Sequence, residues 1–92
     1  SGDPRGELLD GGKMIGKPNL SGKPEAEGVV RMKVYVDKNG TVTEAKYDPE
    51  FSTTSNNRLV ELARKAALTA KFESHPIKPT RIGWIEFNFK LQ

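Results

Sequence analysis

The sequence predicts a two-layer α+β domain in which one main helix packs on one face of a three-stranded antiparallel sheet, in the order strand, strand, helix, strand. Three observations predict it: an alternating segment closed by an Asn-Gly turn, an apolar stripe at helical spacing, and a second alternating segment near the C-terminal end. The chain has 92 residues, of which 35% are hydrophobic and 29% charged. A chain of this size can form one hydrophobic core, so we expect a single globular domain.

The composition excludes several classes of protein. The chain has no cysteine, which removes disulfide scaffolds, thiolate metal sites and thiol nucleophiles. No apolar run approaches the roughly 20 residues that a helix needs to cross a bilayer. The net charge of +3 comes from 15 basic and 12 acidic residues that are interspersed along the chain. This balance does not by itself indicate an anionic partner.

Residues 1–27 are expected to form a flexible lead-in rich in glycine and proline, and residues 28–92 to form the folded domain. Most of the glycines precede residue 29, where backbone entropy opposes regular structure. Ser1 and Gly2, with no initiating Met before them, are interpreted as a cloning remnant at the start of a piece of a longer protein. The apolar residues that could anchor the lead-in to the core are Leu8, Leu9, Met14, Ile15 and Leu20.

A β-hairpin is predicted over residues 29–47. Apolar and polar residues alternate from Val29, so one face of the first strand should be buried. Asn39 and Gly40 can supply the positive φ angles that a tight hairpin turn requires, and residues 41–47 should return antiparallel. The inward residues of the first strand are Val30, Met32, Val34 and Val36.

A helix is predicted to begin near Ser55. The polar residues 52–57 include several side chains that can accept hydrogen bonds from the free amides of a first helical turn. Apolar residues then recur at steps of three and four, which gives one narrow apolar stripe. Phe72 should fill the core where the helix ends. The stripe consists of Leu59, Leu62, Ala63, Ala66, Ala67 and Ala70.

The last strand is predicted over residues 80–91, because Pro76 and Pro79 prevent the helix from continuing. In a three-stranded sheet two strands are edges, and this long strand is expected to be one of them. Glu86 and Lys90 could protect the edge, or its free backbone groups could dock an extended peptide; the residues leave both alternatives open. The inward residues should be Gly83, Ile85, Phe87, Phe89 and Leu91.

Two motifs that could carry chemistry fit a structural role better. Residues 11–17 have the spacing of a phosphate-binding loop, but Pro18 follows where a hydroxyl is needed and no buried strand precedes the loop. His75 is the only histidine and has no cluster of ligand residues around it in the sequence. We expect a solvated loop residue there, although folding could bring a carboxylate near it. The sequence therefore predicts no catalytic residue, no metal site and no cofactor.

The outward residues of the strands raise the alternative of nucleic-acid binding. A sheet that binds nucleic acid carries aromatic rings that stack on bases and cations that meet phosphates. Two aromatic residues among scattered charges fall short of such a surface, so cross-strand packing on an exposed face is favoured and no nucleic-acid partner is expected. The residues concerned are Arg31, Lys33, Tyr35 and Trp84.

The order and spacing of four segments resemble the C-terminal domain of the energy transducer TonB. The first two are Gly28-Val29-Val30 and Val34-Tyr35-Val36-Asp37-Lys38-Asn39-Gly40-Thr41-Val42. The third is the helix with Leu59, Ala63, Ala66-Ala67-Leu68 and Ala70-Lys71-Phe72, and the fourth is Gly83-Trp84-Ile85-Glu86-Phe87-Asn88-Phe89-Lys90-Leu91. The resemblance covers residues 20–92. It departs from the family after the helix, where a Trp-x-Phe-x-Pro run is common and this chain has Lys71-Phe72-Glu73-Ser74-His75-Pro76.

The resemblance implies a non-enzymatic, periplasmic protein-binding domain, tethered to the inner membrane by an N-terminal part of the protein that associates with a motor complex. Such a domain captures an extended segment of an outer-membrane TonB-dependent receptor by adding it as a strand beside the last strand. A homodimer is left open. The alternative is a structural or sensory accessory domain of another envelope protein, for example a sensor metallopeptidase, that uses the same edge for a different partner. The implied partner-binding residues are Arg81, Ile82, Gly83, Trp84, Ile85, Glu86, Phe87, Asn88, Phe89 and Lys90.

Overall fold

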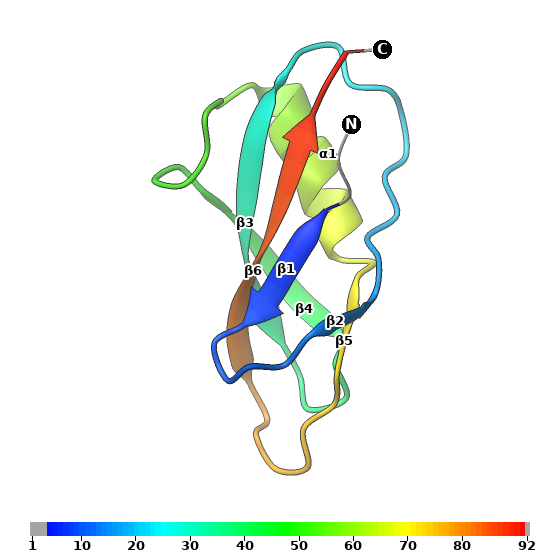
Figure 1. Cartoon of the computed structure of the whole chain (residues 1–92), viewed down its shortest axis with the longest axis vertical. Coiled ribbons are helices and arrows are strands. Elements are labelled where there is room, and N and C mark those ends of the chain that lie inside the picture. Colours follow the sequence, from blue (N-terminus) through cyan, green and yellow to red (C-terminus); the bar gives the residue numbers. More distant parts are fainter. Residues whose placement is uncertain (1–3, 92) are drawn as a thin grey trace.

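The computed structural model describes residues 4–91; the interpretation of Ser1 and Gly2 falls outside these residues. The described part of the chain has one α-helix, a four-stranded antiparallel sheet and a two-stranded sheet (Figure 1). The larger sheet has the strand order β1-β6-β3-β4, and β2 pairs with β5. The elements are β1 (Arg5–Leu8), β2 (Met14–Gly16), β3 (Gly28–Val36), β4 (Val42–Asp48), α1 (Asn57–Ala67), β5 (Lys71–Phe72) and β6 (Arg81–Phe89).

The predicted α+β class is confirmed, and β3, β4, α1 and β6 follow the predicted order of strand, strand, helix, strand. The predicted number of strands is wrong. Residues 5–8 and 14–16 were expected to lack regular structure, but they form β1 and β2, and β1 adds a fourth strand to the sheet. Leu8 lies in the same core as β3 and β6. The fold therefore includes residues before Gly28, because pairing with a distant strand supplies backbone hydrogen bonds that a local pattern does not reveal.

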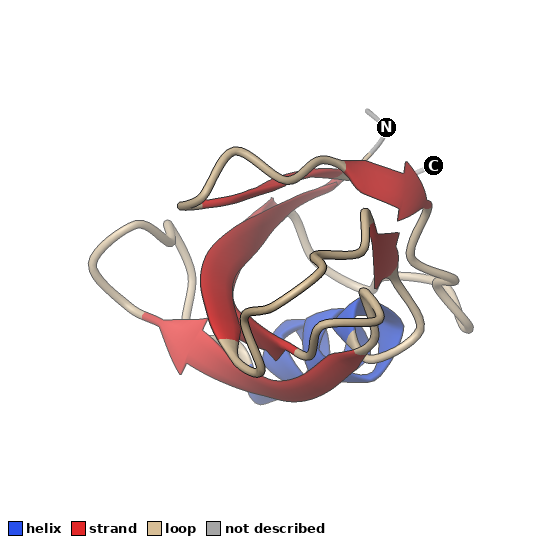
Figure 2. Ribbon diagram, turned by 90° about the horizontal axis from the view of Figure 1, so that it is seen from below, coloured by secondary structure: helices blue, strands red, loops and turns tan. Residues whose placement is uncertain are grey.

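The core lies between the sheet and α1, which packs on one side of the curved sheet (Figure 2). Alternate residues of β3 and β6 point toward this core, as the alternation predicts. Phe72 is also fully buried, which confirms its predicted role. Leu91 was expected to be buried and is exposed, because β6 ends at Phe89. The confirmed inward residues are Val30, Met32, Val34, Val36, Gly83, Ile85, Phe87 and Phe89.

Helix α1 begins within two residues of the predicted start. The side chain of Asn56 caps it by accepting a hydrogen bond of 3.1 Å from the backbone N–H of Leu59. The predicted stripe is buried, and the small alanines in it let the helix axis approach the sheet closely. Ala70 is buried but lies beyond the end of the helix. Thus the polar residues before the helix and the apolar spacing within it were sufficient to locate α1.

The turn between β3 and β4 differs from the expected tight turn. Only Gly40 has a positive φ, of 89°, whereas Asn39 does not. The Asp37 carboxylate accepts hydrogen bonds from the backbone N–H groups of Asn39 (2.9 Å) and Thr41 (3.0 Å), and the ladder shifts its register beside the turn. This arrangement is typical of a longer hairpin loop that ends in a glycine bulge. Asp37 is therefore the side chain that orders this turn.

The Gly40→Ala variant should lose at least about 1–3 kcal/mol of unfolding free energy, the cost of a strained positive φ. A Cβ at this position would also overlap the carbonyl of Phe72, and that contact cannot open freely because the Phe72 amide donates a 2.8 Å hydrogen bond to the Gly40 carbonyl. Gly11→Ala is the matched control, since Gly11 has a φ of 93° with no atom within 4 Å of its added Cβ. Urea denaturation should show a smaller loss for Gly11→Ala; equal losses would contradict the steric argument.

Candidate partner-binding edge

Strand β6 contains nine of the ten residues predicted to bind a partner, and Lys90 follows its end. The strand pairs along its whole length with β3, from Gly28 opposite Phe89 to Val36 opposite Arg81. Its side chains alternate between the core and the outer face of the sheet. The outward side chains are Ile82, Trp84, Glu86 and Asn88, and the inward ones are Arg81, Gly83, Ile85, Phe87 and Phe89.

The other side of β6 was expected to be a free edge, and this expectation is wrong for half of the strand. Strand β1 pairs antiparallel with it, from Arg5 opposite Glu86 to Leu8 opposite Gly83. One residue further on, the Leu9 amide donates a 2.8 Å hydrogen bond to the Ile82 carbonyl. Residues of the supposed lead-in therefore already occupy the backbone groups that an added strand would use.

Two glycines allow β1 and β6 to lie this close. A Cβ on Gly83 would come within 2.8 Å of the Leu8 Cα and would overlap the Glu7 carbonyl. A Cβ on Gly6 would lie 2.7 Å from the Trp84 carbonyl oxygen. Both distances are shorter than a normal van der Waals contact, so neither position accepts a side chain while the two strands stay in register. The space above Gly83 is filled by Leu8, which is 2% exposed.

The C-terminal part of β6, Phe87–Phe89, has no partner strand within the described residues on the side where β1 pairs. If the register of β1 continued by one residue, Pro4 would stand opposite Phe87. This would be a non-hydrogen-bonded position, like those of Gly6 and Leu8, because Leu9 donates to its direct partner Ile82 and the two kinds of pair alternate along an antiparallel ladder. Within Phe87–Phe89, only Asn88 therefore turns its backbone N–H and C=O toward this margin. The margin of the sheet is therefore covered along the first half of β6 and lacks a described strand along the second half.

The outer face beside this margin carries a chain of charged and aromatic contacts. The Arg31 guanidinium lies between two rings, 4.1 Å from the centroid of Trp84 and 5.0 Å from that of Phe51. It is also 3.6 Å from the carboxylate of Glu86, which in turn pairs with Arg5 at 3.0 Å. Two lysines approach the ring of Tyr35 in the same way. Basic side chains of this chain thus already contact Trp84 and Tyr35, the two aromatic residues that could have stacked on bases.

Arg81 was predicted to contact a partner, but its side chain is buried and serves the fold. Its guanidinium pairs with the Asp10 carboxylate at 3.1 Å and donates to the backbone carbonyls of Asp37 and Glu73. The Arg81 guanidinium therefore connects three loops that are distant from one another in the sequence. The hydrogen bond from the Gly12 amide, followed by that from Arg81, lowers the pKa of Asp10 in spite of its desolvation.

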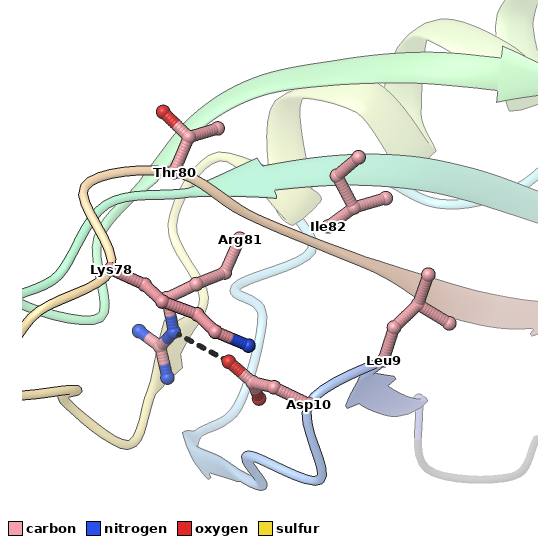
Figure 3. Close-up of a pocket in the computed structure, with 6 residues that line it drawn as sticks. All are labelled: Leu9, Asp10, Lys78, Thr80, Arg81 and Ile82. Atoms are coloured by element: carbon pink, nitrogen blue, oxygen red, sulfur yellow. Dashed lines mark hydrogen bonds and ion pairs between the residues drawn. The ribbon is translucent and has the colours of Figure 1, made fainter.

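A shallow cavity of about 270 Å³ lies next to this ion pair, at the start of β6 (Figure 3). The side chains of Leu9 and Ile82 extend along its apolar wall, and the Lys78 amine points toward Asp10 on the other side (Figure 3). Its lining residues are Leu9, Asp10, Lys78, Thr80, Arg81 and Ile82. The cavity marks the point where the turn after β1 meets the loop before β6.

His75 caps its own turn. Its Nδ1 accepts hydrogen bonds of 3.1 Å from the backbone N–H groups of Ile77 and Lys78, and its own amide donates to the Lys38 carbonyl at 2.7 Å. The ring is thus held by the loop that contains it. Across residues 4–91, no group of three or more His, Asp or Glu side chains is placed to hold a metal ion.

The site residues that sequence reasoning missed are those of β1. The segment was expected to be flexible because residues 1–27 are rich in glycine. Its four residues are too few to show a convincing alternation of apolar and polar residues. One signal was available: Gly83 shares the inward face of the strand with Ile85, Phe87 and Phe89, and an isolated glycine inside a strand often marks a site where another backbone approaches closely. Leu8 was noted as an anchor, and it is the residue that fills the space above Gly83.

No protein-family model matches the chain, no curated protein matches it, and no solved structure matches it. Within residues 4–91 there is no helix of the length and hydropathy that crossing a membrane requires.

Proposed function

We propose that this chain is a periplasmic protein-binding module of a TonB-like energy transducer, which captures an extended segment of an outer-membrane receptor by pairing it with β6. The transducer would be tethered to the inner membrane and its motor complex through an N-terminal part of the protein. The observation that carries the proposal is the position of β6. It is fixed to β3 over nine residues, while only the four-residue β1 separates it from the margin of the sheet. The motif resemblance described above supports the same reading.

Strand pairing suits the capture of a segment whose sequence varies among receptors. Backbone hydrogen bonds supply affinity that does not depend on the partner's side chains, and the outward side chains of β6 adjust the choice of partner. Trp84 and Glu86 are both half-buried on this outer face, next to the place of the added strand. Arg81 contributes only its backbone, because its side chain is buried.

A titration of the isotope-labelled chain with a receptor-derived extended peptide tests the proposal. We expect the largest amide shifts along residues 82–89, and much smaller shifts along β4, which is the opposite edge of the sheet and the internal control. Undisturbed signals along β6 at saturating peptide, or shifts confined to β4, would contradict the proposal. An accessory domain of another envelope protein would respond at β6 to a peptide from a different partner.

A further inference from the structure

Strand β1 contacts β6 through specific side chains as well as through its backbone. Gly6 faces the core side opposite Ile85 and passes close to the Trp84 carbonyl. Leu8, two residues later, enters the space above Gly83 and is buried in the main core. A strand with a large residue at the first position would not fit, because that position has no room for a side chain, whereas the second position holds a side chain of the size of leucine.

The outward residues of β1 add a charge preference. Arg5 pairs with Glu86 at 3.0 Å, and Glu86 also attracts Arg31 from the other side. A basic residue at the position of Arg5 therefore meets a carboxylate, and an acidic residue there would face it unpaired. Glu7 stands opposite Trp84 and is exposed to solvent, so this position is permissive.

A longer segment can compete with β1 for this place. The structure joins β1 to β6 over four residues, and beyond them the backbone N–H and C=O of Asn88 face the same margin with no partner strand in the described residues. A segment that extends past this point can pair with the backbone of Asn88 as well. Those added hydrogen bonds offset the advantage of the tethered β1, whose effective concentration is on the order of millimolar or higher. Short edge strands are also among the parts of a fold that open most easily.

Resting on the proposed function, we infer that the captured segment replaces β1. It runs antiparallel to β6 and carries a basic residue, a small residue, a permissive residue and a leucine-like residue in that order, preceded by about three residues that extend the ladder past Asn88. In the bound state the small residue passes the Trp84 carbonyl, and the leucine-like residue fills the space that Leu8 leaves above Gly83.

The pattern is tested with the peptide Val-Thr-Val-Arg-Gly-Glu-Leu-Leu on the full chain. Replacement of its Gly by Val, or of its first Leu by Asp, should weaken binding about tenfold or more, because one clashes with the Trp84 carbonyl and the other buries a charge. Replacement of its Glu by Thr is the matched control and should change binding little. A nitroxide at the peptide N-terminus should broaden the signals of Asn88 and Phe89, and one at its C-terminus those near Ile82.

Exchange with β1 is tested with the double variant Arg5→Cys/Glu86→Cys, whose positions are direct partners across the two strands. The natural chain has no cysteine, so oxidation yields one defined disulfide that holds β1 in place. The reduced form of the same variant is the reference. We expect the peptide to shift Gly83, Trp84 and Ile85 in the reduced form and to leave them unchanged in the oxidised form.

Each outcome separates this inference from the proposed function. If all the peptides shift β6 equally, the residue pattern is wrong and strand capture stands. If the patterned peptide binds the oxidised and reduced forms equally, it does not replace β1, and the inference is overturned. If no extended peptide, patterned or receptor-derived, perturbs β6 in the reduced, folded protein, both the inference and the proposed function fail.

Discussion

Replacing Phe87 by alanine should lower the unfolding free energy by about 3–5 kcal/mol, the usual cost of removing a buried phenylalanine ring. Phe87 is 1% exposed and stacks against Phe89, with the ring centroids 6.1 Å apart. A domain of this size is stabilised by only about 5–15 kcal/mol in total. The variant should therefore unfold at a much lower urea concentration than the natural protein.

Trp84→Ala is the control for this prediction, because Trp84 belongs to the same strand but points outward. It removes a larger ring that is only half-buried and mainly covers Arg31. Its loss should be much smaller than that of Phe87→Ala, on the order of the 0.5–1 kcal/mol of an exposed cation–π contact plus some buried area. Similar losses for the two variants would show that the outer face contributes as much to stability as the core.

The Arg81→Leu variant should cost a comparable 3–5 kcal/mol, the range measured when one partner of a buried ion pair is removed. The change leaves the Asp10 carboxylate without its cation, and it leaves the Asp37 and Glu73 carbonyls without the donor they now share. Leucine keeps the apolar volume, so lost packing adds little. Urea denaturation at neutral pH measures the difference directly.

Arg5→Leu is the matched control for Arg81→Leu. Arg5 makes an ion pair of almost the same length, 3.0 Å against 3.1 Å, but its side chain is 76% exposed, whereas that of Arg81 is 2% exposed. An exposed ion pair contributes less than about 1 kcal/mol. If both variants lost the same amount, burial would not be what makes the Arg81 contact important.

The Asp10 carboxylate, which accepts hydrogen bonds from the Gly12 amide and from Arg81, should also make stability depend on pH. The Asp10 pKa is lowered in the folded state, so the carboxylate stabilises the fold above its unfolded pKa of about 4. That contribution is lost as the pH falls through the lower, folded pKa. The natural protein should exceed Asp10→Asn in stability at pH 7, and the difference should shrink below pH 4. A difference that stayed constant down to acid pH would contradict this assignment.

Local patterns in the sequence were sufficient for the part of the fold whose strands and helix bury a regular face. The alternation from Val30 to Val36 and the stripe from Leu59 to Ala67 each record which side of an element meets the core. The same alternation placed Ile85 and Phe87 inside correctly. These elements could be predicted because their burial repeats with the period of their own backbone.

The edge of the sheet could not be predicted in this way. Whether β6 is an edge depends on what lies beside it, and that neighbour is Arg5–Leu8, almost the full length of the chain away. The structural role of the Arg81 side chain could not be predicted for a related reason, since its acceptors come from three separate loops. A short stretch of sequence does not contain both Arg81 and its distant partner Asp10. The alternation along β6 therefore indicates only that Arg81 points inward.

The pairing of β1 with β6 joins the two strands of this sheet that come first and last along the chain. Arg5 and Glu86 are 81 residues apart, and closing that loop costs more chain entropy than forming either of the other strand pairs in this sheet. During synthesis β6 also emerges long after β1. Folding should therefore complete β3, β4, α1 and β6 first, and β1 should be the last strand to join. A nascent domain would then pass through a stage in which the whole length of β6 is open.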